Sequence, residues 1–247
     1  MRKALISILL GFFMIFFFIT VQRNSLQAAE VPDASKITRL SLEGEWQFRQ
    51  GGQEKWYKAT VPGCVHTDLM NNGLIPDPYY RDNEVKVQWV ERENWEYRKE
   101  FFIPETIMAR NYIELVCKGL DTYAKIFING NKVAETDNMF RGYRFEVKPF
   151  LQQGRNEIVV FIDSPVNREK AFEEKLPYKI PGNCPFTRKA HYHFGWDWGP
   201  RLTTSGIWRP IYIEAWDAAR VEDLEIDQEF LDKNTVRLNL KLNILSG

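Results

Sequence analysis

The feature that most constrains the fold is a series of short segments in which apolar and polar residues alternate. Trp46 and Phe48, for example, alternate with polar neighbours. A period of two turns one face of each strand toward a core and the other toward solvent. No apolar stripe with a helical period competes over a comparable length. We predict an all-β chain of antiparallel strands at 45–49, 95–103, 111–117, 123–128, 132–134, 143–147, 157–163 and 211–216.

Turn residues separate these segments. Asn129-Gly130 is a strong type I′ hairpin signal, and 154–156 supplies the turn before the 157–163 strand. We expect only short helices, one that follows the turn in 61–69 and one at 167–174. Thr67 or Asp68 is the expected cap of the first of these helices.

A long irregular stretch, 175–204, contains four prolines and is too aromatic to be disordered. Loops of this length inside a compact domain are usually functional. It carries the run His191–Pro200, HYHFGWDWGP, in which Trp196, Asp197 and Trp198 stand side by side. Aromatic rings stack on sugar C–H faces, and a carboxylate accepts hydrogen bonds from sugar hydroxyls. The run predicts a sugar contact if Asp197 projects from a turn; alternatively, the tryptophans pack in the core and Asp197 caps a turn.

Metal and disulfide chemistry find little support in the sequence. His191 and His193 would share a face of a strand, but a zinc site needs a third ligand, and the only other histidine is His66. We therefore expect hydrogen-bonded imidazoles and no metal or other cofactor. Three cysteines, Cys64, Cys117 and Cys184, allow one disulfide or three buried thiols.

The N-terminus reads as a secretory signal over residues 1–29. Arg2 and Lys3 precede a run of apolar residues that ends near Val21, with cleavage expected near Ala28 or Ala29. An uncleaved membrane anchor is the alternative, although the run is at the lower limit for a span. We expect a secreted or periplasmic protein with no stable membrane association after cleavage. Cations and acids balance at 33 each, which gives no reason to expect nucleic-acid binding.

Alternating segments at 221–230 and 235–244, joined by a loop at 232–234, predict a further hairpin. Two strands alone do not form a stable sheet. We therefore expect a second β domain to begin near Ala218, and the chain to be the N-terminal part of something longer. No nucleophile elbow, phosphate loop or convincing carboxylate pair suggests catalysis within the chain itself.

Several segments, in order along the chain, together resemble the β-mannosidases of glycoside hydrolase family 2. They are VPGCVHTDLMNNGLIPDPYYRDNE (61–84), WEYRKEF (95–101), GLDTYAKIFINGNKVAETDNMFRGYRF (119–145), RKAHYHFGWDWGP (188–200) and SGIWRPIYIEAW (205–216).

This resemblance implies a jelly-roll, galactose-binding-like β-sandwich over 30–217 and the truncated start of an immunoglobulin-like sandwich over 218–247. A catalytic (β/α)8 barrel and further sandwich domains follow in the family. It implies a retaining exo-β-mannosidase whose two catalytic glutamates lie on the barrel, so that no catalytic residue lies in this chain.

The resemblance also assigns roles within the sandwich. Trp196, Asp197 and Trp198 would contact the terminal mannose of a β-mannoside oligosaccharide, and the barrel of the same protein would complete the pocket. His193 and Arg201 would shape the loop. Two other interpretations stay open: a free-standing carbohydrate-binding module without hydrolase activity, and a non-catalytic scaffold.

Overall fold

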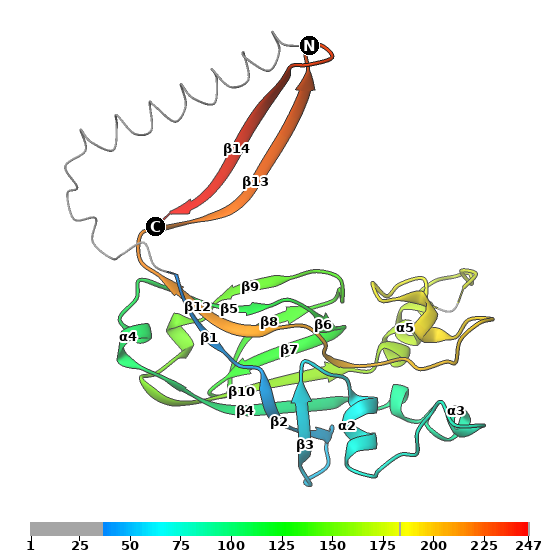
Figure 1. Cartoon of the computed structure of the whole chain (residues 1–247). Helices are drawn as coiled ribbons and strands as arrows, with labels where there is room; N and C mark the ends of the chain where they lie inside the picture. The colour runs from blue at the N-terminus through cyan, green and yellow to red at the C-terminus, as the bar shows by residue number, and fades with distance from the viewer. Residues whose placement is uncertain (1–36, 183, 247) are drawn as a thin grey trace, which may run out of the picture. The chain divides into compact units, whose positions relative to one another are not determined.

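Two antiparallel sheets enclose the core of the larger unit, which spans Thr38–Ala215 in a computed structural model that describes residues 37–182 and 184–246 (Figure 1). The predicted all-β, galactose-binding-like fold is confirmed. One sheet has the order β1 (Thr38–Ser41), β12 (Ile211–Trp216), β5 (Tyr112–Cys117), β9 (Tyr143–Glu146). The other has the order β3 (Tyr57–Val61), β2 (Gly44–Gln50), β4 (Trp95–Ile103), β10 (Gly154–Asp163), β7 (Tyr123–Ile128), β8 (Asn131–Thr136).

The alternation in the sequence becomes the inner face of the sandwich. In β10, Ile158, Val160 and Ile162 are fully buried while their neighbours are half-buried. Ile113 and Leu115 of β5 meet them in the same core from the other sheet. Burying one such side chain contributes about 2 kcal/mol, so this face fixes the register of both sheets.

The hairpin between β7 and β8 follows its turn signal. Asn129 and Gly130 both have positive φ, 50° and 78°, as a type I′ turn requires. Most predicted strands have ends within a few residues of the observed ones, whereas β1, β3 and the two-residue strands β6 (Leu120–Asp121) and β11 (Gly206–Ile207) were not predicted. Two-residue strands lack enough residues to show an alternating pattern.

Short helices close the ends of the sandwich. In Figure 1, α2 (Val65–Asn71), α3 (Asn83–Lys86) and α5 (Pro165–Glu173) lie toward one end and α4 (Glu105–Met108) toward the other. Single 3-10 turns form η2 (Val90–Arg92), η3 (Lys148–Phe150) and η4 (His191–Phe194).

The predicted cap of α2 is wrong. Cys64 is the N-cap, and Thr67, three residues later, forms the reciprocal half of a capping box with its hydroxyl on the Cys64 N–H at 3.4 Å. Thr67 also donates to the carbonyl of Cys64 at 2.7 Å. A cysteine rarely takes this position, and the second half of the box lies where the sequence suggested the cap itself.

Residues 216–246 contain a long hairpin of β13 (Ala219–Phe230) and β14 (Val236–Ser246). It confirms the predicted pair of strands, and its large apolar side chains, such as Leu240, are exposed. The start of an immunoglobulin-like domain stays a prediction. The predicted signal over 1–29 lies outside the described residues. Within the described ones, no helix is long and apolar enough to cross a bilayer.

Candidate functional site

The Trp-Asp-Trp run forms a tight turn on the surface of the sandwich unit. Trp196 and Gly199 exchange backbone hydrogen bonds of 3.3 and 3.4 Å, which places Asp197 and Trp198 at its tip. Trp196 is 55% exposed, Trp198 is 70% exposed, and the Asp197 side chain is also exposed. The alternative in which these indoles pack in the core is therefore wrong. The turn presents two apolar rings and one carboxylate to solvent.

Gly195 lets the chain enter this turn. Its φ is +91°, a region that costs a side-chain-bearing residue free energy. A Cβ at this position would lie 3.3 Å from the Cβ of Arg201. The residues before Gly195 do not form the strand that would place His191 and His193 on one face, because His191–Phe194 forms the 3-10 turn η4. His191 and His193 consequently do not share a strand face.

Arg201 holds the other end of the turn. Its guanidinium donates to the buried Glu91 carboxylate from Nε and from Nη2, the latter at 2.9 Å, and from Nη1 to the carbonyl of Phe194 at 3.0 Å. The Arg201 backbone N–H donates to Glu84 at 2.6 Å. Arg201 thus ties the aromatic run to η2 and α3 from behind.

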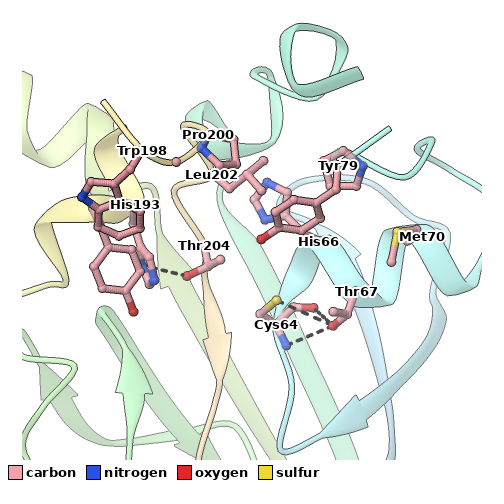
Figure 2. Close-up of a pocket in the computed structure, with 13 residues that line it drawn as sticks. Cys64, His66, Thr67, Met70, Tyr79, His193, Trp198, Pro200, Leu202 and Thr204 are labelled. Atoms are coloured by element: carbon pink, nitrogen blue, oxygen red, sulfur yellow. Dashed lines mark hydrogen bonds between the residues drawn. The ribbon is translucent and has the colours of Figure 1, made fainter. Parts of the chain in front are cut away.

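A cavity of about 430 Å³ opens beside the turn (Figure 2). Figure 2 shows His193 and Trp198 on one side, and Cys64, Thr67 and Met70, which lie at and along α2, on the other. Of the predicted sugar-contacting residues, Trp198 lines this cavity, whereas Trp196 and Asp197 do not. His193 lines it and Arg201 does not.

The two sides of the cavity are joined through the backbone. Gly63 N–H donates to the carbonyl of Ile207 at 2.9 Å, and Val65 N–H donates to that of Ser205 at 2.8 Å. Gly206 packs directly against this start of α2, since a Cβ there would lie 2.6 Å from the Gly63 oxygen. Segments far apart in sequence therefore meet as one surface.

A buried ion pair lies behind His193. The Lys189 ammonium and the Asp121 carboxylate are almost wholly buried and hydrogen-bonded to each other. The Thr204 hydroxyl donates to Asp121 at 2.7 Å, contacts Lys189 at 3.2 Å and reaches Nδ1 of His193 at 3.2 Å.

Both cavity histidines are held neutral. Burial, together with the smaller effect of the nearby positive charge of Lys189, lowers the pKa of both His66 and His193 to about 4. Nδ1 of His66 is enclosed with no hydrogen-bond partner among the described residues. Neutral imidazoles act as hydrogen-bond donors and acceptors without carrying charge into the cavity.

Asp68 anchors α2 to β3 and β4. It is 2% exposed, accepts from the Thr60 N–H at 3.0 Å and accepts from the Tyr97 hydroxyl at 2.9 Å. Burial raises its pKa to about 6, because the two hydrogen bonds offset only part of the desolvation of the carboxylate.

Metal and disulfide chemistry have no visible basis in this part of the chain. In residues 37–182 and 184–246 no three His, Cys, Asp or Glu side chains are grouped as a metal site would need. Cys64, Cys117 and Cys184 are free thiols, and only Cys64 is not buried.

Sequence reasoning missed several residues of this site. Tyr79 and Tyr192 line the cavity, and the Lys189–Asp121 pair supports it from behind. The sequence did mark both segments that supply the two tyrosines, since 61–84 and 188–200 each carry part of the family resemblance. Nothing in the sequence itself showed that they pack against each other.

Comparisons with known proteins identify the family of the sandwich unit. Residues 46–209 match the family described as "Glycosyl hydrolase 2 galactose-binding domain-like". The chain is 37% identical over 200 residues to the β-mannosidase of Bos taurus, covering 76% of this chain and 23% of that protein. It is 36% identical over 216 residues to β-mannosidase B of Thermothelomyces thermophilus, covering 84% of this chain and 25% of that protein.

Solved structures extend the likeness to three dimensions. The crystal structure of the β-D-mannosidase from Dictyoglomus thermophilum is 45% identical with a TM-score of 0.82, covering 85% of this chain and 26% of that one. The chain spans about a quarter of the length of each of these three proteins. The chain belongs to the galactose-binding domain-like family of the family 2 glycosyl hydrolases.

Proposed function

We propose that this chain forms one wall of the terminal mannose site of a retaining exo-β-mannosidase. The two catalytic glutamates lie on a (β/α)8 barrel outside these 247 residues, which contribute no catalytic residue. The substrate is a β-mannoside oligosaccharide, and the barrel of the same protein is the partner that closes the pocket. No cofactor is required by this chemistry.

The observation that carries the proposal is the exposed turn at Trp196–Gly199. Its indoles offer flat apolar surface to the C–H face of a pyranose, and Asp197 offers a carboxylate to its hydroxyls. Proteins named β-mannosidase at 36–45% identity support the assignment of the sugar. A wall at this position would admit a chain end and exclude an internal sugar unit.

The decisive experiment is Asp197→Ala in the full-length enzyme that the proposal requires. A loss of at least tenfold in kcat/KM for an aryl β-mannoside, about 1.4 kcal/mol of transition-state stabilisation, is expected. Asp227→Ala, an exposed carboxylate on β13, is the matched control and should change little. A loss smaller than tenfold at Asp197 would make it a scaffold residue.

The isolated chain provides a second test. Purified, it should not hydrolyse an aryl β-mannoside, and turnover free of contaminants would overturn the proposal. A reading frame that continues past Gly247 into a barrel supports it, and a stop codon there would favour the carbohydrate-binding module. Calorimetric binding of mannose at millimolar or lower concentration by the isolated chain would also favour that module.

The proposed location is secreted or periplasmic, with residues 1–29 removed. Its basis is the basic, then apolar, then small-residue order of the N-terminus. N-terminal sequencing of the protein recovered from the medium or periplasm should begin at Ala29 or Glu30. Recovery of intact Met1 in the membrane fraction would instead show an uncleaved anchor.

A further inference from the structure

We propose that His193 is a hydrogen-bond acceptor for a hydroxyl of the bound ligand, with its Nε2 kept unprotonated by the Lys189–Asp121–Thr204 cluster behind it. The identity of the ligand as a mannoside rests on the proposed function. The orientation and tautomer of His193 rest on hydrogen bonds in this chain alone.

The argument begins with the single proton of the Thr204 hydroxyl. A threonine hydroxyl donates once and accepts twice. Its 2.7 Å contact with Asp121 takes the proton, because a carboxylate paired with the Lys189 ammonium only accepts. Lys189 has only protons to offer, so its 3.2 Å contact uses one lone pair of Thr204.

The second lone pair of Thr204 faces Nδ1 of His193 at 3.2 Å. Since the hydroxyl proton is already committed to Asp121, Nδ1 must supply the proton for this contact. His193 is then the Nδ1–H tautomer, and its Nε2 carries a lone pair. The hydrogen bond made by one ring nitrogen thereby decides what the other can do.

The cluster that sets this tautomer is rigid. Lys189 and Asp121 expose 0% and 3% of their side chains. Thr122 donates a further hydrogen bond to Asp121, at 2.5 Å. A buried ion pair of this kind is costly to break. The Asp121 carboxylate therefore stays beside Thr204 and remains the strongest acceptor for its hydroxyl proton. The tautomer of His193 is consequently fixed before any ligand arrives.

Nε2 of His193 is left for a ligand. The His193 side chain lines the cavity, and no described residue makes a hydrogen bond to Nε2. The backbone is held on both sides, because Thr203 donates to the His193 carbonyl at 3.1 Å and the His193 N–H donates to Ala190 at 3.0 Å. Figure 2 shows the ring beside Trp198, with its Thr204 contact dashed. A pKa lowered to about 4 keeps the ring neutral at physiological pH.

The surroundings select a neutral, hydroxyl-rich ligand. No charged side chain is among the residues that line the cavity, and the polar groups of its side chains are hydroxyls, a thiol, the indole N–H of Trp198 and two neutral imidazoles. The Lys189 charge is balanced by Asp121. A uronic acid would bring a carboxylate toward the Nε2 lone pair with no cation to receive it. A neutral hexoside brings the O–H donor that Nε2 needs.

The test uses the full chain labelled with ¹⁵N-histidine, which has three imidazoles to assign. Long-range ¹H–¹⁵N spectra should show His193 protonated at Nδ1 and bare at Nε2 at pH 7. Thr204→Val keeps the β-branched shape but removes the hydroxyl, and should produce a mixture of tautomers, whereas Thr204→Ser should restore the single form. An Nε2–H tautomer in the wild-type chain, or no change in Thr204→Val, would overturn the proposal.

Titration with methyl β-D-mannoside, methyl β-D-glucoside and glucuronate, carried well above millimolar concentration because half of a pocket binds weakly, then tests the ligand. A neutral hexoside should shift the Nε2 resonance of His193 and leave that of the exposed His191 unchanged. His193→Gln, which can still offer an acceptor, should weaken this binding less than His193→Phe. A shift caused by glucoside but not mannoside would contradict the proposed function and retain the acceptor role. A response to glucuronate alone, or to none of the three, would overturn that role.

Discussion

Arg201 and Glu91 stand 110 residues apart in the sequence, yet the Arg201 guanidinium forms three hydrogen bonds of 2.9–3.1 Å with the Glu91 carboxylate. The side chain of Glu91 is 6% exposed and that of Arg201 is 32% exposed. The pair therefore lies at the edge of the interior, where it joins η2 to the base of the aromatic turn.

Arg201→Met should destabilise the fold by about 3 kcal/mol, because it leaves the Glu91 carboxylate buried without its cation. Urea unfolding measures the loss. Arg155→Met is the matched control, since Arg155 is 81% exposed and 3.8 Å from its partner, and it should change stability by less than about 0.5 kcal/mol. Equal effects at the two positions would contradict the structural role of the Arg201 pair.

Gly195→Ala should destabilise the chain by about 1–3 kcal/mol and displace the turn. The new methyl group would contact the Arg201 side chain. In addition, the backbone of residue 195 has a φ of +91°, which strains any residue other than glycine. Gly199→Ala, four residues on, has nothing within 4 Å of the new methyl and no positive φ, so it should be tolerated. Thermal unfolding and iodide quenching of the tryptophans report the two effects. Tolerance of Gly195→Ala would show that the entry to the turn is not constrained.

Asp68→Asn should remove the pH dependence that the ionisation of Asp68 gives to the free energy of unfolding. The pKa of Asp68 in the folded chain, about 6, lies above its ordinary value of 3.8. Its favourable contribution is therefore complete below pH 3.8 and lost as the pH rises through 6. The variant should gain up to about 3 kcal/mol over wild type between pH 4 and 8, because an amide can hydrogen-bond to both Thr60 and Tyr97 without charge.

Measuring that difference, and not the wild-type curve alone, is essential. His66 and His193, with pKa values lowered to about 4, contribute stability above pH 6.5 that is lost as the pH falls toward 4. This dependence has the opposite sign to that of Asp68. Unfolding curves for both proteins at each pH separate the two. A constant difference between variant and wild type would show that Asp68 ionises normally in the folded chain.

Cys64 should be the one thiol that reacts with an aromatic disulfide reagent in the native chain. It lines the cavity and is part-exposed, whereas Cys117 and Cys184 are buried and burial raises the pKa of both thiols. Native protein should release about one equivalent of reporter thiol, denatured protein three, and native Cys64→Ser almost none. Methyl β-D-mannoside, added well above millimolar concentration, should slow the reaction if it occupies the same cavity. Release of two or more equivalents from native protein would contradict the burial of the others.

The strands of this fold could be predicted where alternation extends over several residues. The β4, β7 and β12 strands have the predicted ends, and the Asn129–Gly130 turn has the predicted geometry. Strands of two residues such as β6 could not be predicted, because contacts between residues far apart in the sequence decide their pairing. The N-cap of α2 also escaped, since its cysteine is held by a box that becomes visible only with coordinates.

The exposed turn of the site could be predicted, but not the cavity beside it. Gly195 and Gly199 bracket the run and favour a turn, and the structure has one. The Lys189–Asp121 pair could not be found, because a lysine and an aspartate 68 residues apart look like two solvated charges. Their burial results from the packing of β6, β11 and the 188–204 segment together.

The contact of Gly206 with Gly63 has a consequence for how this surface can be altered. The two backbone segments pack against each other there with no side chain between them, so a change in the path of one directly disturbs the other. A segment swap between relatives that replaces 61–84 alone, or 188–207 alone, would bring together backbones shaped for different partners. A chimera should therefore exchange the two segments together, although they lie far apart in the sequence.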